Sequence, residues 1–174
     1  MKRFKKSHLW LYLLIFIVIL ILFTVTFDSL SFIYCPIVLS PISYGGFLIL
    51  KVIGIPVIFD GPFGEPVFFE YQLPYTVLQI TFGCAGIFAL FILLAGIIAF
   101  PCLLKLKCIG IILSIPCFYM YSIFRLVFIC IIGYLFPSLL NFVHSYFMEI
   151  INIVFIMFVY IIWIRYVEKT SKTV

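Results

Sequence analysis

Long apolar runs, separated by short groups of charged residues, dominate the pattern along the chain. A transmembrane helix needs about 20 consecutive apolar residues. Bounding each run by the cations at its ends predicts four membrane-spanning helices. They cover residues 9–27, 82–103, 109–132 and 145–164. The predicted fold class is an all-α, polytopic integral membrane protein, with one transmembrane domain over residues 1–174.

A fifth apolar segment, residues 37–59, carries features that disfavour a simple spanning helix. Its glycines, prolines and one charge are Pro41, Gly45, Gly46, Lys51, Gly54 and Pro56. Proline and glycine weaken a helix, and a charge inside lipid is costly. A single crossing here would also move Lys105 and Lys107 to the outer side. We therefore expect a re-entrant, interfacial or hairpin segment that returns to the outer face.

Residues 60–80 begin with turn signals, Asp60-Gly61-Pro62 and Phe63-Gly64-Glu65-Pro66, and continue into a Phe/Tyr/Val-rich stretch that contains Pro74. Glycine and proline at this density are typical of turns and loops. We predict an extracytoplasmic loop over residues 60–80. The chain shows no internal repeat or linker that would divide it into domains.

Composition excludes an ordinary soluble globular protein. The chain is 67% hydrophobic and 10% charged, with a mean hydropathy of +1.38, whereas soluble domains carry about 25% charged residues. Too few polar side chains are present to cover the surface of a soluble fold of this length. Lipid is therefore the expected solvent for most of the chain.

The distribution of charge, with a net charge of +5, predicts the topology. Nine of the eleven cations lie in three groups, which are Lys2, Arg3, Lys5 and Lys6, then Lys105 and Lys107, then Arg165, Lys169 and Lys172. The acids Asp28, Asp60, Glu65 and Glu70 lie between these groups. The positive-inside rule then places both termini in the cytoplasm and predicts a multi-pass protein of the plasma membrane. The aromatic interleaving of a nucleic-acid reader is absent, so no nucleic-acid partner is expected.

The first span resembles a signal peptide, but its 19 apolar residues, 9–27, are longer than the apolar region of most signals. The residues that follow, Asp28-Ser29-Leu30-Ser31, do not form a small-x-small cleavage site. We therefore expect an uncleaved anchor.

Six cysteines show neither a CxxC pair nor zinc-ligand spacing. They are Cys35, Cys84, Cys102, Cys108, Cys117 and Cys130. A cysteine inside an apolar span most often packs as a small hydrophobic residue. No metal and no cofactor is expected from this pattern.

Arg125 is the exception among the charges, because it lies within the apolar stretch Ile123-Phe124-Arg125-Leu126-Val127. A guanidinium at mid-membrane costs at least ~2.5 kcal/mol and marks a functional position by default. The alternative is a side chain that extends along the helix to reach the interface.

Counting depth along the helices places three chemically capable residues in one plane. Cys84 lies 21 residues before Lys105, and Arg125 lies 18 after Lys107. His144 lies 21 residues before Arg165. At 1.5 Å per residue these depths are roughly 31, 27 and 31 Å. A thiol, a permanent cation and an imidazole near the outer face are the components of a thiol-dependent acyl-transfer site.

Each candidate also has a structural interpretation. Cys84 could pack as a small residue, although its neighbours in Gly83-Cys84-Ala85-Gly86 leave room for another chain and a helix start favours a thiolate. His144 could be an interfacial histidine bonded to water or loop backbone. Glu149 and Asn152 could orient the imidazole or bind neighbouring helices, and a structural role is favoured for both.

The order of these motifs resembles the exosortase/archaeosortase family of membrane transpeptidases over roughly residues 45–160. The matching elements are Gly54-Ile55-Pro56-Val57, Cys84-Ala85-Gly86-Ile87, Arg125 and His144. The chain differs from the family in having Ala85 where serine is usual and in lacking an asparagine just before Arg125. It is also shorter than the larger members, so it resembles a minimal core member.

The resemblance implies a cysteine transpeptidase or protease. Cys84 would attack a peptide bond near the C-terminal sorting signal of an exported protein, a short motif followed by a transmembrane helix. His144 would act as general acid and base, and Arg125 would stabilise the oxyanion. The implied partners are these exported substrates and a lipid or envelope acceptor. The sorting motif and the oligomeric state do not follow from the sequence.

Two other classes of function compete with this one. A small transporter or channel subunit would use Arg125 and His144 to line an anion or proton path. A non-catalytic membrane assembly factor would need neither these residues nor Cys84 for chemistry.

Overall fold

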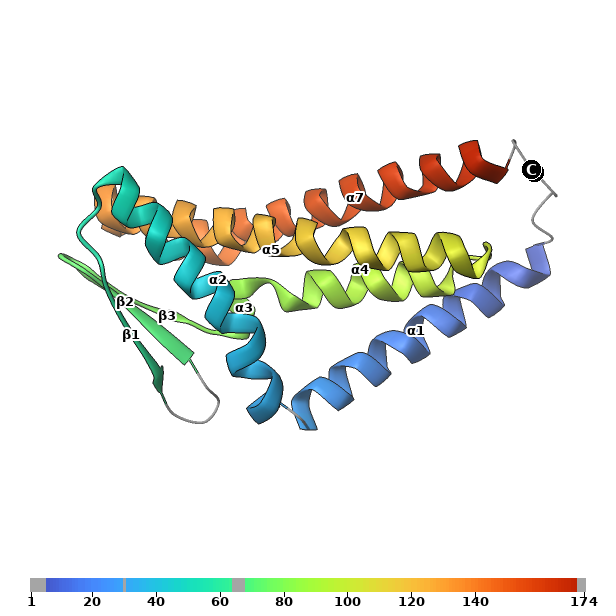
Figure 1. The fold of residues 1–174 in the computed structure, drawn as a ribbon, viewed down its shortest axis with the longest axis horizontal. Helices are drawn as coiled ribbons and strands as arrows, with labels where there is room; N and C mark the ends of the chain where they lie inside the picture. The colour runs from blue at the N-terminus through green and yellow to red at the C-terminus, as the bar shows by residue number, and fades with distance from the viewer. Residues whose placement is uncertain (1–5, 30, 64–67, 172–174) are drawn as a thin grey trace.

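A computed structural model of the chain describes residues 6–29, 31–63 and 68–171 as a bundle of helices with a small β-sheet (Figure 1). The N-terminal part contains α1 (Lys6–Ser29), α2 (Ser31–Ile53), β1 (Ile58–Phe63), β2 (Phe68–Leu73) and β3 (Thr76–Ile80). The C-terminal part contains α3 (Phe82–Ala85), α4 (Ile87–Ala99), α5 (Leu104–Leu135), η1 (Pro137–Leu139), α6 (Leu140–Phe142), η2 (Val143–Phe147) and α7 (Met148–Ser171).

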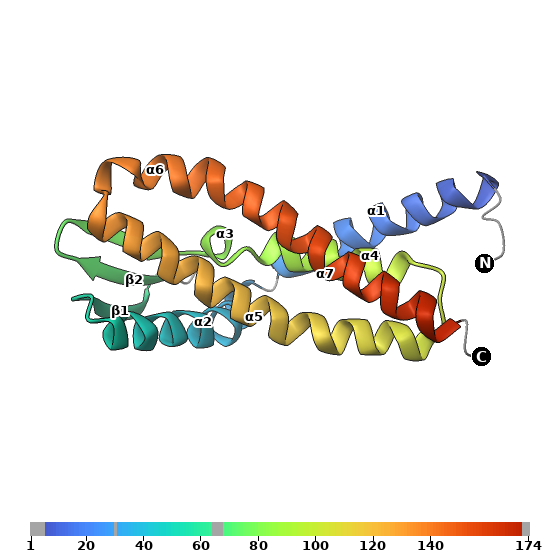
Figure 2. The same cartoon turned by 90° about the horizontal axis from the view of Figure 1, so that it is seen from above.

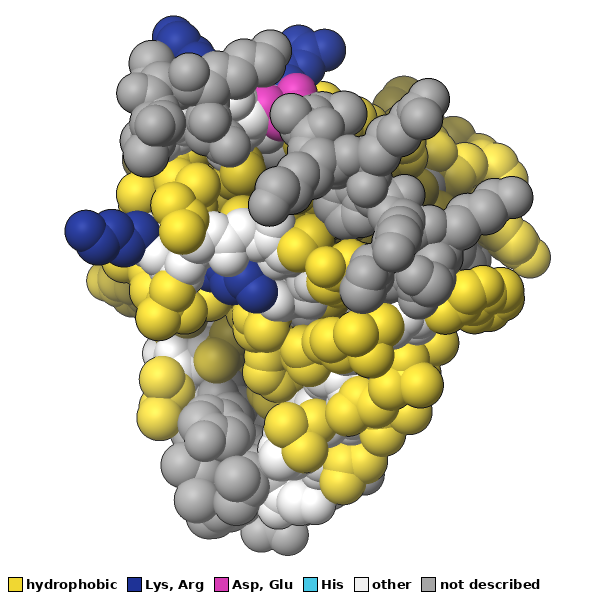
Figure 3. All heavy atoms as spheres, turned by 90° about the vertical axis from the view of Figure 1, so that its right-hand side faces the viewer, with side chains coloured by type: hydrophobic (Ala, Val, Ile, Leu, Met, Phe, Trp, Pro, Cys, Tyr) yellow, Lys and Arg dark blue, Asp and Glu magenta, His cyan; other side chains and the backbone are white. Residues whose placement is uncertain are grey.

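The helices run between two chemically different ends (Figures 1 and 2). At the basic end, which we define by Lys105, Lys107, Arg165 and Lys169, α1 begins, α4 ends, α5 begins and α7 ends. At the opposite end, the sheet end, lie β1 to β3 and the return from α5 to α7. Figure 3 looks onto the basic end, where Lys and Arg side chains lie at several points of a largely apolar surface.

Among the described residues, three helices are long and apolar enough to cross a membrane. They cover residues 10–27, 104–135 and 137–170 and so overlap the predicted spans 9–27, 109–132 and 145–164. The predicted span 82–103 is not confirmed. Its helix, α4, has 13 residues, fewer than the ~20 that a crossing needs. Glycine at 86 and proline at 101 delimit it.

The apolar segment 37–59 is not a hairpin, because α2 is one helix of 23 residues. It starts where α1 ends and leads to the sheet end, away from the basic end (Figure 1). Its glycines, which in sequence weaken a helix, serve close packing instead. A Cβ atom on Gly45 would lie 2.8 Å from Ile123 Cδ1, and one on Gly46 would lie 2.7 Å from Tyr71 Oη. The absence of side chains at these two positions lets α2 approach α5 and the sheet.

The expectation of an all-α fold holds in part, because the chain is mostly helical but residues 60–80, predicted as a loop, contain β-strands. This region forms a three-stranded antiparallel sheet in the order β1-β2-β3. In β2, alternate residues Phe69, Tyr71 and Leu73 are buried, the period-2 pattern of a strand with one packed face. Leu73 pairs with Thr76, so the two residues between them form a tight hairpin turn. The proline at position 74 lies in this turn and not within a strand.

Tyr71 attaches the sheet to the helices. Its side chain is fully buried, and its hydroxyl donates a hydrogen bond to the Ser43 carbonyl of α2. Burial raises the pKa of Tyr71, so the hydroxyl stays protonated as a donor. Leu39, Phe118 and Leu126 complete the apolar cluster around it. The strands are therefore fixed against α2 and α5.

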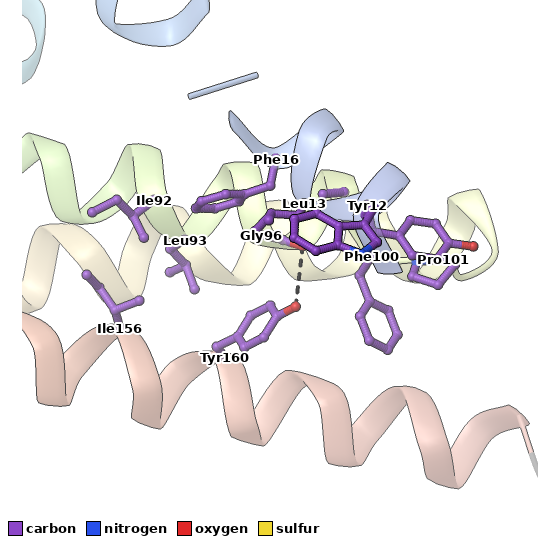
Figure 4. Close-up of a pocket in the computed structure, with 12 residues that line it drawn as sticks. Tyr12, Leu13, Phe16, Ile92, Leu93, Gly96, Phe100, Pro101, Ile156 and Tyr160 are labelled. Atoms are coloured by element: carbon purple, nitrogen blue, oxygen red, sulfur yellow. Dashed lines mark hydrogen bonds between the residues drawn. The ribbon is translucent and has the colours of Figure 1, made fainter. Parts of the chain in front are cut away.

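A separate apolar cavity of about 600 Å³ lies among α1, α4 and α7 (Figure 4). Its lining includes Phe16, Leu93 and Ile156, and the Tyr160 hydroxyl on its wall donates to the Gly96 carbonyl at 3.5 Å. None of the three candidate catalytic residues lines it. A hydrocarbon lining of this kind suits apolar groups and offers few partners to a polar ligand.

The close contact at Gly46 yields a stability prediction. A methyl group on Gly46 would collide with the Tyr71 hydroxyl, so we expect Gly46→Ala to destabilise the protein by about 1–3 kcal/mol, as overpacking does. Gly133→Ala is the matched control, because a Cβ there meets its nearest neighbour, Leu140 Cδ1, at 3.5 Å, an ordinary contact. Thermal unfolding in detergent, followed by tryptophan fluorescence, measures both. Equal Tm values for the two variants would contradict the tight packing of α2.

Candidate active site

Cys84 lies in a tight turn that joins the sheet to the bundle. Thr81 continues β3 in an extended conformation, with φ −106° and ψ 176°. The four residues of α3 then end at Gly86, whose φ of +72° is left-handed. Such a φ strongly favours glycine. The Gly86 N–H lies within hydrogen-bonding distance of the Phe82 and Gly83 carbonyls, which fixes the turn around the thiol.

The thiol of Cys84 contacts the imidazole of His144 from the last helical segment. The distance from Sγ to Nε2 is 3.0 Å, although the two residues are 60 positions apart. Sγ also lies 3.4 Å from the Gln79 carbonyl oxygen of β3. Burial raises the pKa of the Cys84 thiol, but hydrogen bonds from His144 and from the Thr81 backbone outweigh burial and lower it. A lowered pKa favours the thiolate, the nucleophilic form.

A π-helical segment, η2 (Val143–Phe147), sets the direction of His144. In a regular α-helix of 3.6 residues per turn, residues five apart point about 140° away from each other. The i→i+5 bonding of a π-helix widens the turn and brings such residues toward one face. His144 and Glu149, five apart, thereby face the same region of the bundle. Segments of this kind occur frequently at functional sites.

Arg125 is buried inside the bundle, with 2% of its surface exposed. Its Nη1 donates to Asn152 Oδ1 at 3.3 Å, and its Nη2 lies 3.8 Å from Glu149 Oε1. Within the described part of the chain, its Nε has no hydrogen-bond partner. Arg125 therefore packs inside the bundle and does not extend along its outer surface. The guanidinium stays inside and keeps one N–H donor unused.

The guanidinium of Arg125 lies directly against the turn that carries Cys84. A Cβ atom on Gly86 would lie 2.8 Å from Arg125 Nη1 and 3.2 Å from Asn152 Oδ1. Any side chain at position 86 would occupy this space. Cys84, Arg125 and His144, which the depth count placed in one plane, thus converge from α3, α5 and η2.

Three further residues take part in the site. Glu149 and Asn152, predicted to orient the imidazole or to bind neighbouring helices, contact Arg125 on the neighbouring α5. Tyr121 is not among the residues that the sequence predicts for the site. Its hydroxyl donates to Asn152 Oδ1 at 2.6 Å. Two helical spacings could have indicated them, since Tyr121 precedes Arg125 by four residues and Glu149 precedes Asn152 by three, so each pair shares a helix face.

Of the other described cysteines, the buried Cys130 is close enough to Cys84 to interact with it electrostatically. Cys102 lies between α4 and α5, and Cys108, Cys117 and Cys130 lie on α5. The side chain of Cys35 lies outside the described part of the structure. Within that part, no group of three His, Cys, Asp or Glu residues could hold a metal ion.

The chemistry available here is that of a thiol paired with an imidazole beside a buried cation. Such a pair can attack a carbonyl carbon, and a nearby guanidinium can stabilise the negative oxygen that results. Comparisons with protein-family models, curated proteins and solved structures found no match to the chain. The resemblance to the exosortase/archaeosortase family therefore rests on the residues themselves.

The Cys84–His144 contact predicts an unusual alkylation profile. The lowered pKa of Cys84 should let it react with iodoacetamide at lower pH than Cys102, whose pKa burial raises. His144→Ala should move the midpoint for Cys84 to higher pH, because the hydrogen bond that stabilises the thiolate is lost. Peptide mass spectrometry of detergent-solubilised protein over a pH series measures each midpoint separately. Identical midpoints for both cysteines, or no effect of His144→Ala, would contradict the pairing.

Proposed function

We propose that the protein is a membrane cysteine transpeptidase or protease that cleaves C-terminal sorting signals of exported proteins. The observation that carries this proposal is the 3.0 Å contact between Cys84 Sγ and His144 Nε2, beside a guanidinium that is buried and only partly satisfied. Burying an unsatisfied cationic donor is costly. A substrate oxygen that accepts from it offers a functional reason for that cost.

The first half of the reaction is acylation. The Cys84 thiolate attacks the carbonyl carbon of the substrate peptide bond, and Arg125 stabilises the oxyanion by hydrogen bonding. When the carbon–nitrogen bond breaks, the His144 imidazolium gives its proton to the leaving amine. A thioester between the substrate and Cys84 remains, and His144 is neutral.

The second half releases the product. An acceptor with an amine or hydroxyl group, from a lipid or an envelope component, attacks the thioester carbon. His144 takes the proton of the acceptor, the carbon–sulfur bond breaks, and the thiolate–imidazolium pair returns. Water as acceptor gives hydrolysis instead of transfer by the same steps.

The location of the site supports an extracytoplasmic reaction in the plasma membrane. Cys84 and His144 belong to the half of the molecule toward the sheet end, whereas Lys105 and Lys107 mark the basic end. The positive-inside rule assigns such cations to the cytoplasm. Exported substrates held by a C-terminal transmembrane helix would then meet the site after translocation.

A transporter is less well supported by the interior of the bundle. Between the site and the basic end, the described core is mainly apolar, as at Leu93 and Ile97, and the buried Ser114 hydroxyl bonds to a carbonyl of its own helix. A proton or anion path would need polar groups at successive depths. The polar network around Arg125 instead stays at the level of Cys84.

Loss of the thiol should abolish processing. We expect Cys84→Ala to leave the sorting signals of exported proteins uncleaved in the native host, because the thiol that is paired with His144 is lost. Cys108→Ala, which removes an exposed cysteine on α5, should process normally. Mass spectrometry of the C-terminal peptides of membrane and secreted proteins, at matched levels of each variant, gives the readout. The same C-termini with wild type and Cys84→Ala would overturn the proposal.

The contact between Gly86 and Arg125 predicts a second effect on activity. Gly86→Ala adds a methyl group where Arg125 Nη1 lies, and displacing an oxyanion donor costs on the order of 100-fold in rate. Gly83→Ala is the matched control in the same turn, because its nearest neighbour would be Thr81 Oγ1 at 3.8 Å. The rates at which the two variants process substrate test whether Arg125 acts beside Gly86. Equal rates would show that Arg125 does not act at this position.

A further inference from the structure

The strand that leads into the candidate nucleophile is an edge of the sheet. Among the described residues, β3 pairs with β2 alone, because the strand order is β1-β2-β3. One face of β3 packs inward through Leu78 and Ile80, whereas Val77 on the other face is 57% exposed. An edge strand presents unpaired backbone donors and acceptors to any extended chain beside it.

The thiol itself shows which backbone groups of β3 point away from the sheet. The Gln79 carbonyl lies 3.4 Å from Cys84 Sγ, so this carbonyl points toward the site and not toward β2. In an antiparallel strand, the backbone groups of every second residue share a direction. The N–H and C=O of Val77 therefore also point outward, and within the described part of the chain no backbone hydrogen bond outside the strand pairing involves them.

The free edge continues into the active-site turn without a break. Val77 and Gln79 precede Cys84 by seven and five residues. Thr81, which lies between Gln79 and Cys84, is still extended. A chain bound along this edge would therefore lead to the thiol. The peptide bond to be attacked must also be extended, because the carbonyls inside a helix are already hydrogen-bonded and crowded by side chains.

We propose, resting on the proposed function, that the substrate binds as a fourth strand on the free edge of β3. The occupant is the extended segment between the exported domain and the transmembrane anchor. Its backbone pairs with Val77 and with the Gln79 N–H, so the strand positions the scissile bond beside Cys84. Recognition of this kind takes its affinity from main-chain hydrogen bonds and its selectivity from alternate side chains.

The direction of the bound strand follows from the geometry of the chain. β3 leads toward Cys84, and α4 then leads on to the basic end (Figure 1). The substrate chain also runs from its exported domain outside the cell to its anchor in the membrane, which is the direction of β3 and α4. The added strand is therefore parallel to β3, and the residues before the scissile bond lie beside Val77.

A proline at position 77 tests the pairing directly. Val77→Pro removes the outward N–H, and prolines are tolerated at edge strands where the N–H faces away from the sheet. The probe is a pool of peptides with about eight randomised residues before a Leu/Ala helix of about 20 residues and a lysine tail. We expect kcat/KM for Val77→Pro to fall roughly tenfold. Val77→Ala, which keeps the N–H, should lose far less.

Two controls establish that the proline variant has folded. Ile58→Pro places a proline at the first residue of β1, on the opposite edge of the sheet, and should cleave the pool like wild type. The iodoacetamide profile of Cys84, which requires no bound strand, should be the same in Val77→Pro and wild type. Equal cleavage by Val77→Pro and Val77→Ala would overturn the strand proposal while leaving the thiol chemistry intact.

Disulfide trapping gives a second, independent measurement. In Cys84→Ala protein, Val77→Cys should cross-link to a cleavable peptide that carries cysteine before the scissile bond. Gln72→Cys, on the strand paired with Val77, should not, because a disulfide needs Cα atoms within about 7 Å. Cross-linking that is equal at both positions, or confined to peptide residues after the scissile bond, would overturn the proposed arrangement.

Different outcomes contradict the proposed cleavage activity and the proposed strand binding. If wild type and Cys84→Ala both leave every peptide of the pool intact, the proposed function fails and the strand proposal fails with it. If wild type cleaves and neither the proline effect nor the cross-link appears, only the strand proposal fails.

Discussion

A guanidinium held away from water is the constraint on which the arrangement of this protein depends. Arg125 is buried on α5, and an unpaired charge in such a place would cost several kcal/mol. Its partners, Asn152 and Glu149, come from α7, and Asn152 is held in turn by Tyr121. These polar contacts, together with the hydrogen bond from Trp163 Nε1 to the Leu106 carbonyl, fix the relative rotation of α5 and α7 in a largely apolar bundle, where apolar packing alone specifies rotation weakly. The same contacts direct His144 toward Cys84.

The sheet extends this order to the thiol. Tyr71 joins β2 to α2 through the Ser43 carbonyl, and Gly46 allows the approach. Because β3 is paired with β2 and continues into α3, the position of Cys84 depends on packing some distance from the site. The short turn that ends at Gly86 then places the Cys84 thiol in contact with His144, which lies 60 positions further along the chain. Precision at the site therefore comes from regular elements on each side of it, as preorganised sites require.

The sequence predicts the parts of this protein that obey simple periodic rules. Apolar runs locate the three long helices, and a constant rise per residue brings Cys84, Arg125 and His144 to one level, a prediction that their contacts agree with. The sheet escapes prediction because the turn signals around Asp60-Gly61-Pro62 and Pro74 outweigh the short alternation of apolar and polar residues in Phe69-Glu70-Tyr71-Gln72-Leu73. The π-helical segment is not predicted, because its residues show no pattern that distinguishes it from an α-helix. Asn152 and Glu149 are visible as an i,i+3 pair, but only the structure shows that they face an arginine.

A sheet in a largely helical membrane protein has a physical rationale in the peptide bond itself. A transmembrane anchor is helical because every backbone group in lipid must be satisfied within the segment. A nucleophile, however, needs an exposed carbonyl with its π face open. Under the proposed function, an edge strand resolves this conflict, because it would supply main-chain hydrogen bonds to the extended substrate segment that precedes the helical anchor. β3 ends where α3 presents the Cys84 thiol, so strand pairing and attack would take place side by side. The sheet would then be the element that holds the scissile bond extended beside the thiol.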